Sequence, residues 1–163
     1  MRQIGIFILL VIITSCSVFK SDKPAMLKCL SERSKNLTLR WGDFLPKENS
    51  FYGYEINAYG ELFFYTKNQK NPDGKKEKIS NLDPTEVCSK LKLVQETILK
   101  TQTLFSPGEN SARFVEFSNP DENMNMLAVW NPAFQTKGSK YFRELYDSLN
   151  ILVPSIRELK NKR

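Results

Sequence analysis

In several stretches of the chain, apolar and polar residues alternate with the period of two that half-buried strands show. The stretch 37–42, LTLRWG, places leucine and tryptophan on one face and threonine and arginine on the other. Residues 51–67 continue the alternation around a turn at 57–60, where Gly60 accepts a positive φ. This pattern predicts a strand followed by a β-hairpin.

Two further strand pairs are expected around turn sequences. The NPDG sequence at 71–74 has proline, aspartate and glycine in the order of a tight turn. It predicts a second hairpin, made by residues 61–67 and about 75–80. Later in the chain, a proline- and asparagine-rich turn separates two short apolar stretches, 112–118 and 124–130, which predict a third strand pair.

Two segments have the period of an amphipathic helix. Asp83 is followed by proline and, three residues on, by glutamate, which is typical of a capped helix start. From there apolar residues recur every three or four positions to about Thr103. A second helix is expected from Ser139 until Pro154 interrupts it, followed by a short third helix to about Leu159.

The order of these elements predicts an α+β fold. We expect an antiparallel sheet of about five to six strands, in two hairpin regions, packed with two main helices. The chain has no internal repeat and no second apolar run of membrane-spanning length, so a single domain is expected.

The first residues have a different pattern. Arg2 precedes an apolar run, 4–13, of about ten residues, whereas a hydrocarbon core needs roughly 20 to be spanned. A charged start, a short apolar run and small residues after it are typical of a secretory signal peptide. The run ends in ITSC, residues 13–16, which resembles the lipobox of bacterial lipoproteins.

The resemblance implies a membrane anchor. Residues 1–15 would be removed as a signal peptide, and Cys16 would carry a diacylglyceryl thioether and an acyl chain such as palmitate. Two or three chains hold a protein on a membrane, where one gives only marginal binding. Residues 16–28 would then be the lipidated cysteine and tether, and 29–163 the globular domain. An ordinary signal peptide with a chance cysteine, or an uncleaved anchor, is the alternative.

The resemblance also implies a location. In Gram-negative lipoproteins an aspartate after the lipidated cysteine favours the inner membrane, and Ser17 stands there instead. We therefore expect an exported protein on the periplasmic face of the outer membrane. In such an oxidising compartment Cys29 and Cys88 either form a disulfide or stay as separate buried thiols.

Composition narrows the possible partners and chemistry. The net charge is +6, and part of the excess lies in 67–78 and 157–163. Neither stretch interleaves aromatic residues with its charges, so nucleic acid is not an expected partner, while anionic lipid or an envelope polymer is an alternative to plain solvation. The chain has no histidine, which excludes histidine-based triads and most zinc sites. No metal or other cofactor is expected.

Aromatic residues concentrate in the first hairpin. Because Phe63, Phe64 and Tyr65 are consecutive, bulky side chains point to both faces of their strand. Either helices cover both faces, or one face is exposed and binds a partner. The candidate binding surface consists of Tyr52, Tyr54, Phe63 and Tyr65.

The sequence does not indicate an enzyme. It has no phosphate-binding glycine loop and no nucleophile elbow, and its candidate carboxylates are expected to be solvated: Asp43, Glu48, Glu55 and Glu61. Our leading hypothesis is a membrane-anchored envelope lipoprotein that binds or scaffolds another envelope component, a protein or a polymer. The alternatives are a small-ligand-binding module, a protease inhibitor, because the element order resembles that of emfourin-like proteins, and a carboxylate-based enzyme.

Overall fold

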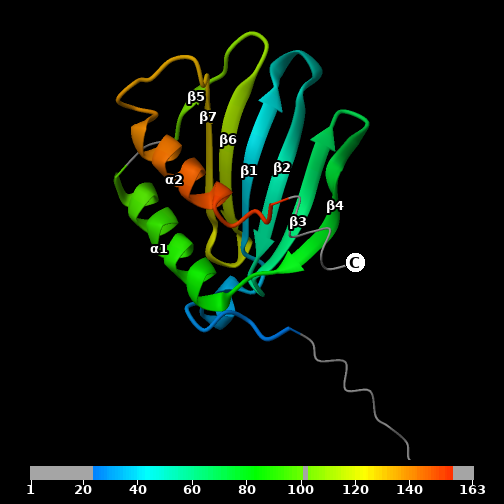
Figure 1. The fold of residues 1–163 in the computed structure, drawn as a ribbon, viewed down its shortest axis with the longest axis vertical. Coiled ribbons are helices and arrows are strands. Elements are labelled where there is room, and N and C mark those ends of the chain that lie inside the picture. Colours follow the sequence, from blue (N-terminus) through cyan, green and yellow to red (C-terminus); the bar gives the residue numbers. More distant parts are fainter. Residues whose placement is uncertain (1–23, 101–102, 156–163) are drawn as a thin grey trace, which may run out of the picture.

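The computed structural model describes residues 24–100 and 103–155, which form one sheet with two helices packed against it (Figure 1). The strands are β1 (Thr38–Leu45), β2 (Ser50–Asn57), β3 (Glu61–Asn68), β4 (Asn71–Asn81), β5 (Phe105–Ser106), β6 (Ala112–Asn119) and β7 (Met124–Trp130). The helices are α1 (Pro84–Lys100) and α2 (Lys140–Asn150). The expected α+β class is confirmed.

The strand order is β4-β3-β2-β1-β6-β7-β5. The expectation of five to six antiparallel strands is wrong in two respects, because the described part of the chain has seven strands and β5 runs parallel to β7. With only two residues, β5 is too short to show an alternating pattern. It is held by backbone hydrogen bonds that Val129 donates to Leu104 and Asn131 donates to Ser106, at 2.7 and 2.9 Å.

The turn between β3 and β4 differs from the one expected. It lies at Gln69 and Lys70, whereas the NPDG sequence lies inside β4. Asn68 pairs with Asn71 across the turn, and its side-chain oxygen accepts the backbone N–H of Asn71 at 2.9 Å. Gly74 adopts the expected positive φ, 79°, but within the strand.

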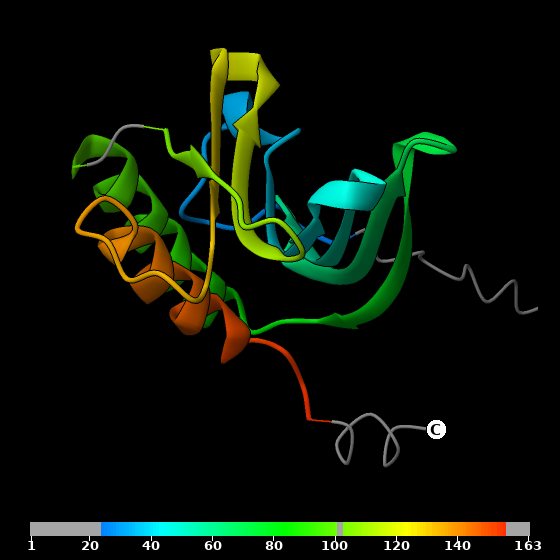
Figure 2. The same ribbon diagram turned by 90° about the horizontal axis from the view of Figure 1, so that it is seen from above.

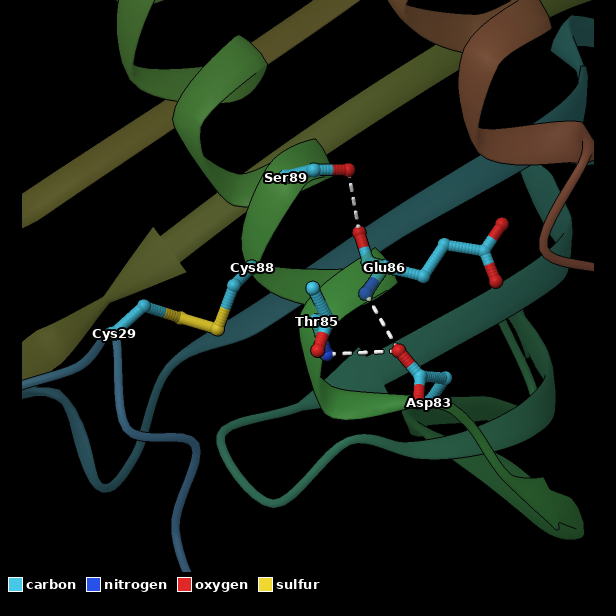
Figure 3. Close-up of a disulfide and its surroundings, with 6 residues drawn as sticks. All are labelled: Cys29, Asp83, Thr85, Glu86, Cys88 and Ser89. Atoms are coloured by element: carbon cyan, nitrogen blue, oxygen red, sulfur yellow. Dashed lines mark hydrogen bonds between the residues drawn. A yellow bond between two sulfur atoms is a disulfide. The ribbon is translucent and has the colours of Figure 1, made fainter.

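The start of α1 is as expected. The Asp83 side-chain oxygen accepts the backbone N–H groups of Thr85 and Glu86 at 2.9 and 3.0 Å, which satisfies donors that have no partner within the helix (Figure 3). In α2, Ser139 precedes the first helical residue, but its hydroxyl donates to the Thr136 carbonyl instead of capping the helix.

Several predictions concern residues outside 24–100 and 103–155. The signal peptide at 1–15 and the anchor at Cys16 lie outside the described residues, as does most of the short helix expected from Pro154 to about Leu159.

The main apolar core lies between the sheet and the helices. We call this side of the sheet the outer face, because Figure 2 shows a strongly curved sheet with both helices outside its curve. Fully buried side chains in this core include Leu39, Trp41, Ile56, Leu62, Val87, Val94, Val115, Ala128, Phe142, Leu145 and Leu149. They come from strands on both sides of the sheet's centre and from both helices, so one core joins the two layers.

The opposite, inner face has a smaller apolar cluster of its own. Phe44, Ala112, Phe114 and Val129 are buried there, and Phe51 packs on Phe44 with ring centroids 4.3 Å apart. Neither α1 nor α2 lies on this face of the sheet (Figure 2). The curvature of the sheet therefore lets the inner face bury its own side chains.

Candidate functional site

The helices cover only part of the outer face. α2 contacts β1 and β6, and the core also buries Ile56 in β2 and Leu62 in β3, but farther along these two strands the outer face is open (Figure 1). Three aromatic residues lie in this open part: Tyr52, Tyr54 and Phe64, which we call the aromatic strip. Tyr54 and Phe64 face each other in register, with ring centroids 6.2 Å apart and rings nearly perpendicular. This edge-to-face arrangement is a favourable one for aromatic pairs.

The aromatic strip continues from the core. Trp41 pairs with Tyr54 in register, with ring centroids 5.7 Å apart, and is fully buried. Its indole N–H donates to the Asn150 side chain at the end of α2, at 3.0 Å. Exposure then rises along the row, and Phe64 is 41% exposed. The strip is therefore an accessible extension of a rigid aromatic row.

Charged residues border the strip on neighbouring strands. Glu77 is the register partner of Phe64, and Asp43 is that of Tyr52, so both lie on the outer face beside the aromatic rings. Burial raises the pKa of Asp43, while the charge of Arg113 acts in the opposite direction. An apolar centre with a polar rim is the usual anatomy of a binding surface.

The inner face carries a row of paired charged residues, unlike the aromatic strip on the outer face. Arg40 donates to Glu55 at 2.7 Å and to Glu116 at 3.1 Å, and Lys76 donates to Glu55 at 2.9 Å. We call these four residues, which cross the sheet from β6 to β4, the charged ladder. Glu55 is fully buried, so its carboxylate relies on these two cations in place of water.

Two aromatic residues complete the charged ladder. The Arg40 guanidinium lies 4.5 Å from the ring centroid of Tyr65, and the Lys76 ammonium lies 4.9 Å from that of Phe63. Burial opposes the charge on Arg40, but the hydrogen bond that it donates to Glu55 and the charges of Glu116 and Glu55 raise its pKa above the ordinary value. For Tyr65, burial favours the neutral phenol and therefore raises its pKa. A cavity of only about 100 Å³ lies here, so the ladder leaves little room for a ligand.

The structure divides the four residues expected to form a binding surface. Tyr52 and Tyr54 lie on the outer face, whereas Phe63 and Tyr65 lie on the inner face with the charged ladder. Phe64, which was not among the four, completes the surface on the outer face. The sequence contains a signal for Phe64, because a hairpin centred on 57–60 pairs position 54 with position 64 and so places both side chains on one face.

The candidate carboxylates do not form a shared site. Glu55 is bound by cations on the inner face, Asp43 lies on the outer face, and Glu48 is exposed in the connection between β1 and β2. Among residues 24–100 and 103–155, no three histidine, cysteine, aspartate or glutamate side chains are grouped to hold a metal ion.

Glu61 makes a testable contribution to acid stability. Hydrogen bonds from Lys78 and Asn57 lower the pKa of Glu61. Its stabilising effect is therefore present above the ordinary glutamate value of about 4.3 and is lost as the pH falls through the lower, folded-state pKa. Lys78→Gln should reduce the free energy of unfolding at neutral pH by at most about 1 kcal/mol, since the pair is partly exposed.

Urea unfolding at neutral and at acid pH tests this expectation. The difference between the wild type and Lys78→Gln should disappear in acid, where Glu61 is protonated in both proteins. Lys75→Gln, an exposed position on the same strand, is the matched control. A difference that persists undiminished in acid would contradict the role of Glu61.

A disulfide lies away from the aromatic strip. Cys29 and Cys88 are bonded, with Cα atoms 5.8 Å apart, and join the segment before β1 to the first turns of α1 (Figure 3). A hollow of about 640 Å³ lies beside the bond, lined by Met26, Leu27, Pro84 and Thr85 among others. Leu27 is buried, and its N–H donates to the Ala58 carbonyl at 3.0 Å, so the segment is attached at two points.

Comparison with known proteins does not assign the chain to a family. No protein-family model matches the chain, and no curated protein is significantly similar to it. Among the described helices, neither is long and apolar enough to cross a membrane.

Proposed function

We propose that this chain is a membrane-anchored lipoprotein of the bacterial envelope, which binds another envelope component through the aromatic strip. The lipobox resemblance at residues 13–16 supports the anchor and the periplasmic face of the outer membrane as its place. The observation that carries the binding role is the strip itself: aromatic side chains on a regular sheet face that the helices leave open.

The geometry favours binding over catalysis. The strip offers ring faces and edges for contact, with Glu77 and Asp43 at its border to select among partners. Glu55, which is fully buried, lies on the other face and is already paired with Arg40 and Lys76. A partner protein or envelope polymer with an apolar or ring-containing surface fits such a strip.

Photocrosslinking from the strip tests the proposal in intact cells. A photoreactive benzoylphenylalanine in place of Phe64 should give a defined crosslinked product in the envelope. The same residue in place of Met124, whose exposure of 37% is close to that of Phe64, is the matched control and should not give it. Tyr52→Ser should reduce the product at least roughly tenfold, since truncating a tyrosine that is an interface hot spot costs about 2 kcal/mol or more and about 1.4 kcal/mol is tenfold.

The anchor is tested separately in the same cells. Incorporation of labelled palmitate and membrane fractionation should both depend on Cys16 and be lost in Cys16→Ser. No product from position 64, or an equal product from position 124, would overturn the binding role. An unlabelled chain that stays with the membranes after Cys16→Ser would overturn the anchor instead.

A further inference from the structure

Large apolar side chains protrude at one corner of the molecule. Here α1 ends, β5 forms the edge of the sheet, and the connection from β7 leads into α2 (Figure 1). Leu99 is 86% exposed, Phe105 is 64% exposed and Phe134 is 67% exposed. Tyr141, in the first turn of α2, is also exposed. We call these four residues the apolar corner.

Hydrogen bonds and a cation–ring contact hold these elements together. Asn131 donates its backbone N–H to Ser106 in β5, and Phe134 donates its own to Asn131, so the turn carrying Phe134 is attached beside Phe105. The Lys100 ammonium lies 6.0 Å from the ring centroid of Tyr141, which brings the end of α1 next to the start of α2. The corner is therefore one region of surface built from four separate elements.

The net charge of this region is positive. Its basic side chains are Lys100, Lys137, Lys140 and Arg143. Two nearby carboxylates, Glu96 and Glu144, lie 3.8 and 4.0 Å from lysine ammonium groups in exposed, loose pairs that contribute little. A third, Glu109, is exposed and lines a hollow with Asn131, so the region has four basic side chains and three carboxylates. All three lysines are exposed, so their ammonium groups can contact an external anionic surface.

We propose that the apolar corner contacts an anionic lipid bilayer. Aromatic and aliphatic side chains that protrude among lysines are the composition of surfaces that lie in the headgroup region of a membrane. Phe105 and Phe134 enter that region, and the lysines pair with lipid phosphates. Isolated protruding side chains suit a fluid acceptor, whereas the aromatic strip, which is half-exposed on a regular sheet face, suits a shaped partner.

This proposal rests on the proposed anchor at Cys16, and the dimensions agree with it. α1 has 17 residues and is about 25 Å long, from the disulfide at its start to the corner at its end. The eight residues from Ser17 to Pro24 span at most about 27 Å. A domain lying along α1 therefore brings the corner to the same bilayer that holds the anchor.

The test uses the full acylated chain in lipid vesicles. A bimane fluorophore is attached at Phe134→Cys or, as the matched control, at Gln69→Cys, an exposed position in the turn next to β4 at the opposite edge of the sheet. The vesicles contain nitroxide-labelled phosphatidylcholine as a quencher, with or without phosphatidylglycerol. The parent chain without an added cysteine reports background labelling.

Quenching at position 134 should exceed that at position 69 in phosphatidylglycerol vesicles. In the bimane-labelled Phe134→Cys chain, adding Lys137→Gln and Lys140→Gln should lower the ratio of contacting to free domains roughly thirtyfold, from the loss of two lysines at an anionic surface. Equal quenching at 134 and 69 on vesicles that carry the protein would overturn the apolar corner alone. Protein that does not float with the vesicles would overturn the anchor and this proposal with it.

Discussion

Replacing Cys29 and Cys88 together by serine is expected to lower the free energy of unfolding by about 2–4 kcal/mol. The bond joins residues 59 positions apart and closes a large loop in the unfolded chain. Its loss therefore raises the conformational entropy of the unfolded state. In the folded state the segment around Cys29 keeps its attachment through Leu27, which is buried and bonded to Ala58. The sheet and helices should therefore still form.

Chemical denaturation of the wild type and the double variant measures the loss. Reducing the wild type should reproduce it, and intact masses with and without reductant should differ by the hydrogens of one disulfide. Ser89→Ala is the matched control, because Ser89 is one residue from Cys88 on the same helix and is exposed (Figure 3). Equal stability of the double variant and the control would contradict a structural role for the bond.

The pairing of the two cysteines illustrates what the sequence leaves open. Nothing local decides whether residues so far apart come within bonding distance, since that depends on where α1 packs against the segment before β1. By contrast, the start of α1 was predictable because its signals are local: the capping aspartate, the proline after it and the spacing of Val87, Leu91 and Val94.

The sheet shows the same division between local and distant signals. The β2–β3 hairpin follows from its own turn, and its register places Tyr54 opposite Phe64. β5 exists only because β7 supplies its partners, so no pattern within Phe105 and Ser106 reveals it. At the second hairpin two local signals competed, and the Asn68 side chain closed the turn earlier than NPDG.

The candidate binding surface was only half predictable for a related reason. Alternation places Tyr52 and Tyr54 on one face of their strand, and Phe63 and Tyr65 on one face of the next strand. Whether these two faces are on the same side of the sheet depends on the register of the hairpin. It does not tell which face the helices cover or how far they extend. That the cover reaches Ile56 and Leu62 but leaves Phe64 accessible is a property of helix position, which depends on contacts such as that between Trp41 and Asn150.

Glu55→Ala is expected to lower the free energy of unfolding by about 2 kcal/mol. Removing one member of a buried ion pair commonly costs 3–5 kcal/mol, because the remaining charge is left without a partner. The expected value here is smaller, since Arg40 keeps Glu116 and the Lys76 side chain is 52% exposed, so both cations can be partly hydrated.

Glu116→Ala is the matched control, because both glutamates bind the same arginine from opposite sides and differ in burial. The Glu116 side chain is 33% exposed, so its removal should cost less than about 1 kcal/mol. Urea unfolding of the two variants at neutral pH decides the question, with Glu55→Gln separating the loss of charge from the loss of volume. Equal effects at positions 55 and 116 would show that burial does not set the strength of the charged ladder. A larger effect at position 55 would mean that the stability of the inner face depends on this buried carboxylate.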